Sequence, residues 1–213
     1  MLPKTYLITI LISTLISFYY FRQLPAYLKS FCFLLGTTLI IECTAYFFVK
    51  KNAWMFNIFT VLEFIFYLSV YGYILNSRKQ KNWLNTFRIL LLLTGIINMS
   101  FFQGLFVFNN YTYALGAIFI CISVVMFYLQ LLNASNPEPL IRVPMFWIST
   151  GLLLFYACNF IFMGLLNYII GISMPLAKQL HTIIYILNIV MYPLFTIGIA
   201  CSSKQTKTNS LPN

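Results

Sequence analysis

The chain has 213 residues, of which 61% are hydrophobic and only 8% are charged. An ordinary soluble domain carries about 25% charged residues, so this composition cannot supply a water-soluble surface. The formal net charge of +10 comes from basic residues scattered between apolar blocks. Because nucleic-acid binding needs such residues gathered on one face, no nucleic-acid partner is expected. The composition therefore predicts that most of the protein surface contacts membrane lipid, which is the first partner we expect.

Seven apolar blocks follow one another along the chain, each close to the roughly 20 residues that cross a bilayer. No small-residue cleavage pattern follows the first block, which favours a retained helix over a signal peptide. The blocks predict an all-α, polytopic membrane bundle of seven transmembrane helices within residues 1–201. Residues 202–213 are small and polar, and we expect them to form a disordered cytoplasmic tail. The predicted spans are Leu2–Phe21, Ser30–Val49, Ala53–Leu75, Leu84–Phe102, Thr112–Leu132, Phe146–Ile170 and Gln179–Cys201.

Lysine and arginine in alternate connections predict the orientation, because cytoplasmic loops are enriched in both. With seven spans, one side of the membrane holds Lys4, Lys50, Lys51 and Lys178. The other side holds Arg22, Lys29, Arg78, Lys79, Lys81, Arg142, Lys204 and Lys207, with Arg88 just inside the fourth span. This asymmetry predicts an amino terminus outside and a carboxyl terminus in the cytoplasm.

Two glutamates lie at membrane depth, where ionisable side chains are costly and usually face the bundle interior. Glu42 in the second block and Glu63 in the third each lie about 12–15 Å from the outer end of their helix. Because these helices are consecutive and antiparallel, the carboxyl groups are expected to share a pocket, and at least one should hold a proton. Such a pair could form a proton or cation site, or anchor a cationic or hydroxylated ligand. Alternatively, each glutamate could be neutral and could fix helix packing through a hydrogen bond. The candidate partners are Tyr46, Tyr67, Thr60 and Asn57.

Further polar side chains recur at helical spacing in the later blocks. In the last block, His181, Tyr185, Asn188 and Tyr192 fall on one helix face. Hydrocarbon cannot satisfy amide and phenol groups, so these groups must meet one another, a water or a ligand. We therefore predict a polar, ligand-binding cavity in the outer half of the bundle. Its predicted residues are Glu42, Asn57, Glu63, Asn98, Tyr156, Asn159, His181, Tyr185 and Asn188.

The sequence contains few of the residues that usually bind metals and cofactors or catalyse reactions. His181 is the only histidine and aspartate is absent, so neither a metal site nor another cofactor is expected. The histidine could respond to protons or simply bond a neighbouring carboxylate or carbonyl. A zinc-dependent hydrolase and a retinal protein are disfavoured, the latter because no lysine lies deep in the last block. No catalytic residue is predicted. Aromatic residues at block ends are interpreted as interface anchors, namely Trp54, Trp83, Trp147, Tyr111 and Tyr113.

Five segments carry a resemblance: Ile41-Glu42-Cys43, Phe56 to Phe64, Val143 to Ile148, Tyr156 to Asn159, and His181 to Val190. Together they resemble a group of bacterial seven-helix membrane proteins that occur alone and as sensory input regions ahead of histidine kinases. The resemblance implies a periplasm-facing sensory bundle in the bacterial inner membrane. The sequence holds no kinase or other output domain, so a separate cytoplasmic signalling partner would be required.

Three functions remain open from the sequence. The first is a sensor or small-ligand-binding module, in which a small molecule or lipid in the cavity shifts helix packing. The second is a small proton-coupled transporter, which would require a route to both faces and broken helices. The third is a lipid-modifying enzyme that would use Glu42 and Glu63 as acid and base.

Overall fold

The computed structural model describes residues 2–48, 52–134 and 139–209, with side chains from residue 4 to 203 within those ranges. Every regular element in these ranges is helical. Three short turns of helix, η1 (Phe21–Gln23), η2 (Asn98–Phe102) and η3 (Leu140–Arg142), lie between longer ones. The longer helices are α1 (Leu2–Tyr20), α2 (Ala26–Phe47), α3 (Ala53–Ile74), α4 (Arg78–Ile97), α5 (Asn110–Leu132), α6 (Pro144–Gly164), α7 (Leu166–Ile172) and α8 (Met174–Asn209).

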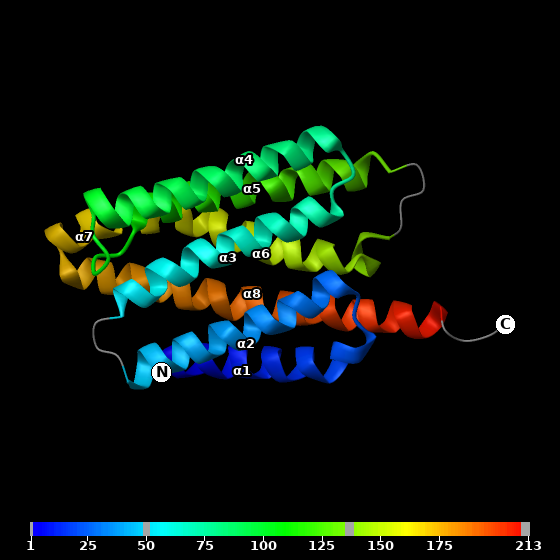
Figure 1. Ribbon diagram of the computed structural model, residues 1–213. Coiled ribbons are helices and arrows are strands. Elements are labelled where there is room, and N and C mark those ends of the chain that lie inside the picture. Colours follow the sequence, from blue (N-terminus) through cyan, green and yellow to red (C-terminus); the bar gives the residue numbers. More distant parts are fainter. Residues whose placement is uncertain (1, 49–51, 135–138, 210–213) are drawn as a thin grey trace.

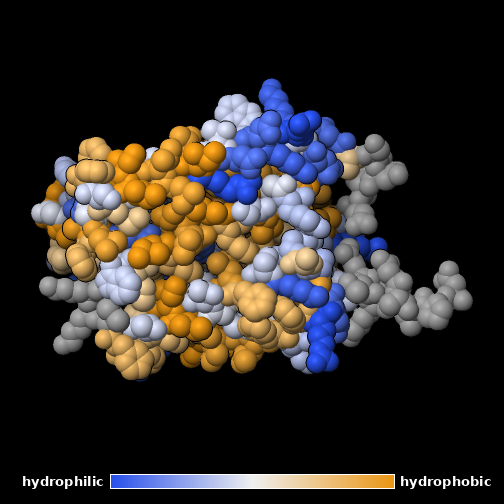
Figure 2. All heavy atoms as spheres, in the orientation of Figure 1, coloured by the Kyte–Doolittle hydropathy of each residue, from blue (hydrophilic) through white to orange (hydrophobic). Residues whose placement is uncertain are grey.

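Seven of these helices, α1 to α6 and α8, are long and apolar enough to cross a membrane. The predicted class, an all-α bundle with seven spans, is therefore confirmed. Large apolar side chains on the outside of the bundle support the same conclusion, since Ile40, Leu62 and Ile96 are all well exposed. Figure 2 shows hydrophobic residues over most of one face. A surface of this kind is suited to lipid.

The spans alternate in direction, so the connections gather at two ends of the bundle (Figure 1). One end, here called the amino-terminal end, holds the start of α1, the α2–α3 and α4–α5 connections, and α7. The other, the carboxyl-terminal end, holds the α1–α2, α3–α4 and α5–α6 connections and the end of α8. The basic residues Arg22, Lys29, Arg78, Lys79, Lys81 and Arg142 lie at or near the carboxyl-terminal end. Lys50 and Lys51 lie outside the described residues.

The helices form a ring with one weak seam. α8 packs along α6 and α1, α5 joins α6 to α3 and α4, and α2 packs on α1. α2 and α3 contact each other little, although they are consecutive. The α6–α8 contact is close because Gly198 faces the Pro144 carbonyl oxygen, which would lie 2.6 Å from an added Cβ. α4 contacts α3 and α5, which places it on the periphery of the bundle.

The carboxyl-terminal half of the bundle is filled by side chains. Phe31, Leu152 and Phe195 are fully buried there, and the Phe31 and Phe195 rings pack edge to face with centroids 5.8 Å apart. The buried Tyr71 hydroxyl has a partner there, since it lies 2.8 Å from Ser149 Oγ in a hydrogen bond, whereas Thr14 Oγ1 and Gln23 Oε1 have none among the described residues. This half of the bundle is thus a packed core.

Two predicted boundaries differ from the structure. The predicted span Phe146–Ile170 divides into α6 and α7, because the chain turns after Gly164, whose carbonyl oxygen accepts a hydrogen bond from Asn110 Nδ2. The predicted boundary at residue 201 falls inside α8, which continues to Asn209. Ser203 remains buried there, and its hydroxyl donates to the Ala200 carbonyl oxygen. Residues 210–213 of the predicted tail lie outside the described residues.

Candidate functional site

A cavity of about 510 Å³ opens inside the amino-terminal half of the bundle. Its walls come from α1, α2, α3, α5, α6 and α8, and its rim includes Asn52, Phe108 and Leu166. Pockets that hold small molecules are typically about 300–1,000 Å³. The volume is therefore sufficient for a small organic molecule.

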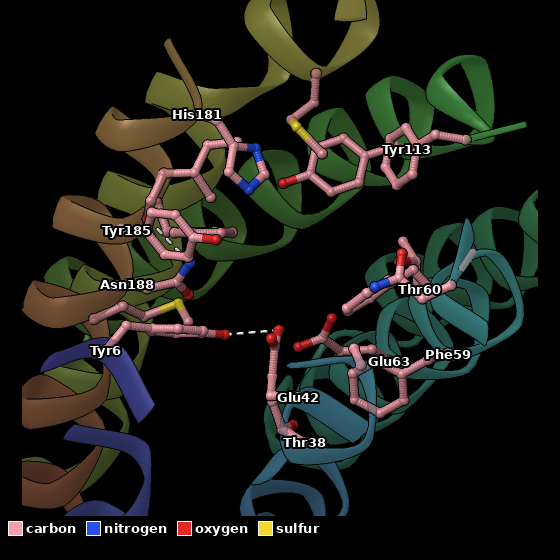
Figure 3. Close-up of a pocket in the computed structure, with 18 of the residues that line it drawn as sticks. Tyr6, Thr38, Glu42, Phe59, Thr60, Glu63, Tyr113, His181, Tyr185 and Asn188 are labelled. Carbon is pink, nitrogen blue, oxygen red and sulfur yellow. Dashed lines mark hydrogen bonds between the residues drawn. The ribbon is translucent and has the colours of Figure 1, made fainter. Parts of the chain in front are cut away.

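The two membrane glutamates meet in this cavity. Glu42 from α2 and Glu63 from α3 both line it, and Figure 3 shows their carboxyl groups pointing toward one another. The Tyr6 hydroxyl donates to Glu42 Oε1 over 2.8 Å, and the Tyr67 hydroxyl donates to Glu63 Oε1 over 3.0 Å. The predicted shared pocket is present.

In the part of the chain that the structure describes, each glutamate thus has one phenolic partner and no charged one. Within residues 4–48, 52–134 and 139–203, no lysine, arginine or histidine nitrogen comes within 4.0 Å of either carboxylate. Of the partners expected from the sequence, Tyr67 bonds Glu63, whereas Tyr46 and Thr60 line the same cavity without a hydrogen bond to either acid in the described part of the chain. The bond from Tyr6 was not anticipated, because it joins residues 36 positions apart and local spacing carries no sign of it.

The predicted polar face of α8 also lines the cavity, with His181, Tyr185, Asn188 and Tyr192 all contributing to its wall. Tyr185 lies between two rings, with its centroid 5.5 Å from that of Tyr6 and 5.0 Å from that of His181. Asn188 is buried and its Nδ2 donates to the Ile184 carbonyl oxygen, one turn earlier on α8. Its Oδ1 accepts no hydrogen bond from any described residue. His181 is exposed and lies toward the rim.

Two further tyrosines have hydroxyl groups that bond no other described residue. Tyr156 from α6 is 2% exposed and Tyr113 from α5 is 7% exposed, and both line the cavity. Their ring centroids lie 6.2 Å apart, but neither hydroxyl bonds another group among the residues that the structure describes. Tyr113 was interpreted as an interface anchor, which is wrong, because α5 begins at Asn110 and turns this side chain inward. Tyr113 lies inside the bundle because α5 already begins at Asn110.

Three predicted site residues, Asn57, Asn98 and Asn159, do not line the cavity. Asn57 lies on a different face of α3 from Glu63, since six residues correspond to about 240° of helical rotation. Asn98 follows α4, which α3 separates from the cavity. Asn159 is buried in α6, and its Nδ2 has no hydrogen-bond partner in the described structure.

Asn57 and Asn98 instead belong to an amide cluster that closes the amino-terminal end. Asn57 Nδ2 donates to the carbonyl oxygens of Leu105 and Val107, each over 2.8 Å, and its Oδ1 accepts from the Asn109 backbone N–H over 2.8 Å. Asn98 Nδ2 donates to Gln103 Oε1 over 2.7 Å and also to Asn109 Oδ1. The cluster fixes the connection between η2 and α5, which places Phe108 at the cavity rim.

The chain was compared with protein-family models, curated proteins and solved structures. None of them matches it. The cavity must therefore be interpreted from its own chemistry.

The cavity supplies hydrogen-bond acceptors and aromatic faces. Glu42, Glu63 and the Asn188 carbonyl oxygen are acceptors, and the Tyr6, Tyr185 and Tyr192 rings lie beside them. No group of three or more His, Cys, Asp or Glu side chains that could hold a metal ion occurs in the described residues. The arrangement is suited to binding a molecule that carries donors and positive charge.

Proposed function

We propose that this multi-pass membrane protein is a sensor or small-ligand-binding module, whose ligand occupies the cavity in the amino-terminal half. The observation that carries the proposal is the pairing of Glu42 and Glu63 inside a cavity of about 510 Å³ with no charged partner among the described residues. Ionisable groups at membrane depth are usually retained for function.

The packed carboxyl-terminal half supports binding in preference to passage. Phe31, Leu152 and Phe195 fill the bundle beyond the cavity, and the Tyr71–Ser149 hydrogen bond joins α3 to α6 across that half. A carrier would need this core to separate during each cycle. A module that binds and reports has no such requirement.

α8 offers a route by which occupancy could be reported. Its 36 residues correspond to about 54 Å of helix, and the same helix carries cavity residues and extends to the carboxyl-terminal end. Pro193 directly follows Tyr192 within it, and an internal proline removes one helix hydrogen bond and favours a bend. A ligand that displaces Tyr185 and Tyr192 would bend α8 next to Pro193 and so move the end of the helix.

The proposed orientation places the cavity on the periplasmic side of a bacterial inner membrane and the end of α8 in the cytoplasm. The excess of basic residues at the carboxyl-terminal end supports this orientation, as does the resemblance to sensory input regions. The receiver of the signal would then be a separate cytoplasmic protein.

Occupancy of the cavity can be tested by native mass spectrometry of protein purified in lipid nanodiscs. A small molecule should remain bound to the natural protein and be lost in Ala45→Phe, because Ala45 lines the cavity and a phenyl ring there would fill part of it. Ala157 is exposed on α6, so Ala157→Phe is the matched control and should retain the molecule. The proposal fails if no compound binds the natural protein, or if Ala45→Phe binds as well as the control.

A further inference from the structure

We propose that the cavity binds a protonated primary or secondary amine, with the ammonium group between Glu42 and Glu63 and an apolar body along the aromatic wall. This inference rests on the proposed ligand-binding function. It adds the chemical class of the ligand.

The charge of the site favours a cationic ligand. Glu42 and Glu63 face one another in the cavity (Figure 3), and each accepts one hydrogen bond, from Tyr6 and Tyr67 respectively. Two carboxylates at this depth cannot both ionise readily without a cation nearby, and no described side chain supplies one. An ammonium group between them carries one positive charge, so it would compensate one carboxylate while the other carboxyl group holds a proton. An anionic ligand would instead add an uncompensated negative charge.

The unsatisfied acceptors favour an ammonium group that carries N–H donors. The Asn188 Oδ1 is an acceptor only, and the side chain is 6% exposed and lines the cavity. The hydroxyl oxygens of Tyr113 and Tyr156 also lack partners in the described residues, and both side chains are more than nine-tenths buried. A primary or secondary amine can donate to such oxygens, but a quaternary ammonium has no N–H.

The wall beside the acids favours an organic cation over an inorganic one. The Tyr6, Tyr185 and Tyr192 rings form a cluster with centroids 5.5 and 6.1 Å from that of Tyr6. Aromatic faces attract cations electrostatically. Phe59, Ile184 and Met191 add apolar surface, which an organic body would cover and a bare metal ion would leave empty.

The length of the cavity indicates how the amine would lie. Glu63 lies 11 residues beyond Asn52, which precedes α3, and Tyr192 lies 11 residues beyond His181 on α8, so the two residues of each pair are about 16 Å apart along the helix axis. Asn52 and His181 line the rim, and Glu63 and Tyr192 line the deep end. An elongated amine would therefore place its nitrogen deep and its body toward the amino-terminal end.

Matched sets of compounds test the class of ligand directly. We would measure the thermal stability of the natural protein in nanodiscs with 2-phenylethylamine, 2-phenylethanol and trimethyl(2-phenylethyl)ammonium, and with hexyl and indolylethyl sets of the same three head groups. In at least one set, the amine should bind about tenfold or more tightly than its alcohol and its trimethylated form, which corresponds to one charge-assisted hydrogen bond. This comparison needs no variant.

Variants then assign the contacts. Glu42→Gln and Glu63→Gln should each weaken amine binding by about tenfold or more and weaken alcohol binding less, because glutamine keeps an acceptor oxygen and loses the charge. Tyr156→Phe should weaken it by about threefold, whereas the matched change at an exposed tyrosine, Tyr73→Phe, should have no effect. If the glutamine variants do not fold, Tyr156→Phe against Tyr73→Phe still tests the site.

The outcomes that overturn the inference are distinct from those that overturn the proposed function. If alcohols or anionic compounds bind as well as amines in every set, the cavity is a ligand site but not an amine site. If sodium or calcium chloride stabilises the protein and amines do not, the ligand is an inorganic cation. If no compound of any class binds, both the inference and the ligand-binding function are wrong.

Discussion

The two halves of the bundle use similar residues in different ways. In the carboxyl-terminal half, the buried Tyr71 hydroxyl has a partner in Ser149, and aromatic rings fill the remaining space. In the amino-terminal half, the equally buried Tyr156 leaves its hydroxyl without a partner among the described residues and faces a cavity. Because buried polar groups are normally satisfied, the first arrangement indicates packing, and the second is the arrangement on which the proposed ligand site rests.

The largest expected difference between the halves is the effect of truncating a phenylalanine. Phe195 is fully buried in the packed half, so Phe195→Ala should lower the free energy of unfolding by about 3 kcal/mol. Phe59 lines the cavity, so its ring contacts fewer neighbouring atoms. Phe59→Ala should therefore lower the free energy of unfolding by only about 1 kcal/mol. Unfolding in mixed micelles measures both, and equal losses would remove the distinction between the halves.

A loss of about 2 kcal/mol is expected for Asn57→Ala, which leaves the Leu105 and Val107 carbonyl oxygens and the Asn109 N–H without their partner. Hydrogen exchange should accelerate at residues 105–109 and remain slow in α6. Asn133→Ala is the control, because Asn133 is exposed and donates only to the Leu129 carbonyl oxygen of its own helix turn. Unchanged exchange in Asn57→Ala would show that the amide cluster does not hold this connection.

Removing single hydroxyl groups sharpens the comparison further. Tyr71→Phe should cost about 1 kcal/mol, because it breaks the buried bond to Ser149. Tyr113→Phe breaks no hydrogen bond between described residues, so its free energy of unfolding should stay within about 0.5 kcal/mol of the natural protein. The opposite order in a thermal unfolding series would mean that the cavity hydroxyls are structural.

The smallest expected effect on stability belongs to the carboxyl pair. Glu63→Gln keeps an acceptor for the Tyr67 hydroxyl, so the empty protein should unfold within about 0.5 kcal/mol of the natural one. A loss near 3 kcal/mol in the same measurement would assign Glu63 to packing, since leaving a buried polar group without its partner costs up to about that much.

The sequence predicts those features of the fold and the site that depend on local patterns of residues. Block length and composition predict the seven spans, and helical spacing alone places Tyr185 and Asn188 on one face of α8. The meeting of Glu42 with Glu63 follows from two antiparallel neighbours of similar depth. Each of these inferences needs only the geometry of one helix or of one adjacent pair.

The remaining features depend on contacts that local patterns do not record. The bond from Tyr6 to Glu42 requires knowing that α1 and α2 present these residues at the same depth. Asn98 was assigned to the cavity because its depth is suitable, but the peripheral position of α4 removes it. Asn57 shows the same limit, since its bonds reach residues about 50 positions away, across a connection of irregular backbone.

The most direct test of the account is a high-resolution structure of the protein in lipid, determined with and without an amine that stabilises it. We predict density for a small molecule in the cavity, with its nitrogen within hydrogen-bond distance of Glu42 and Glu63 and a shifted α8. The contradicting result is a cavity closed by its own side chains, with the two carboxyl groups bonded directly to one another and the same structure in both conditions.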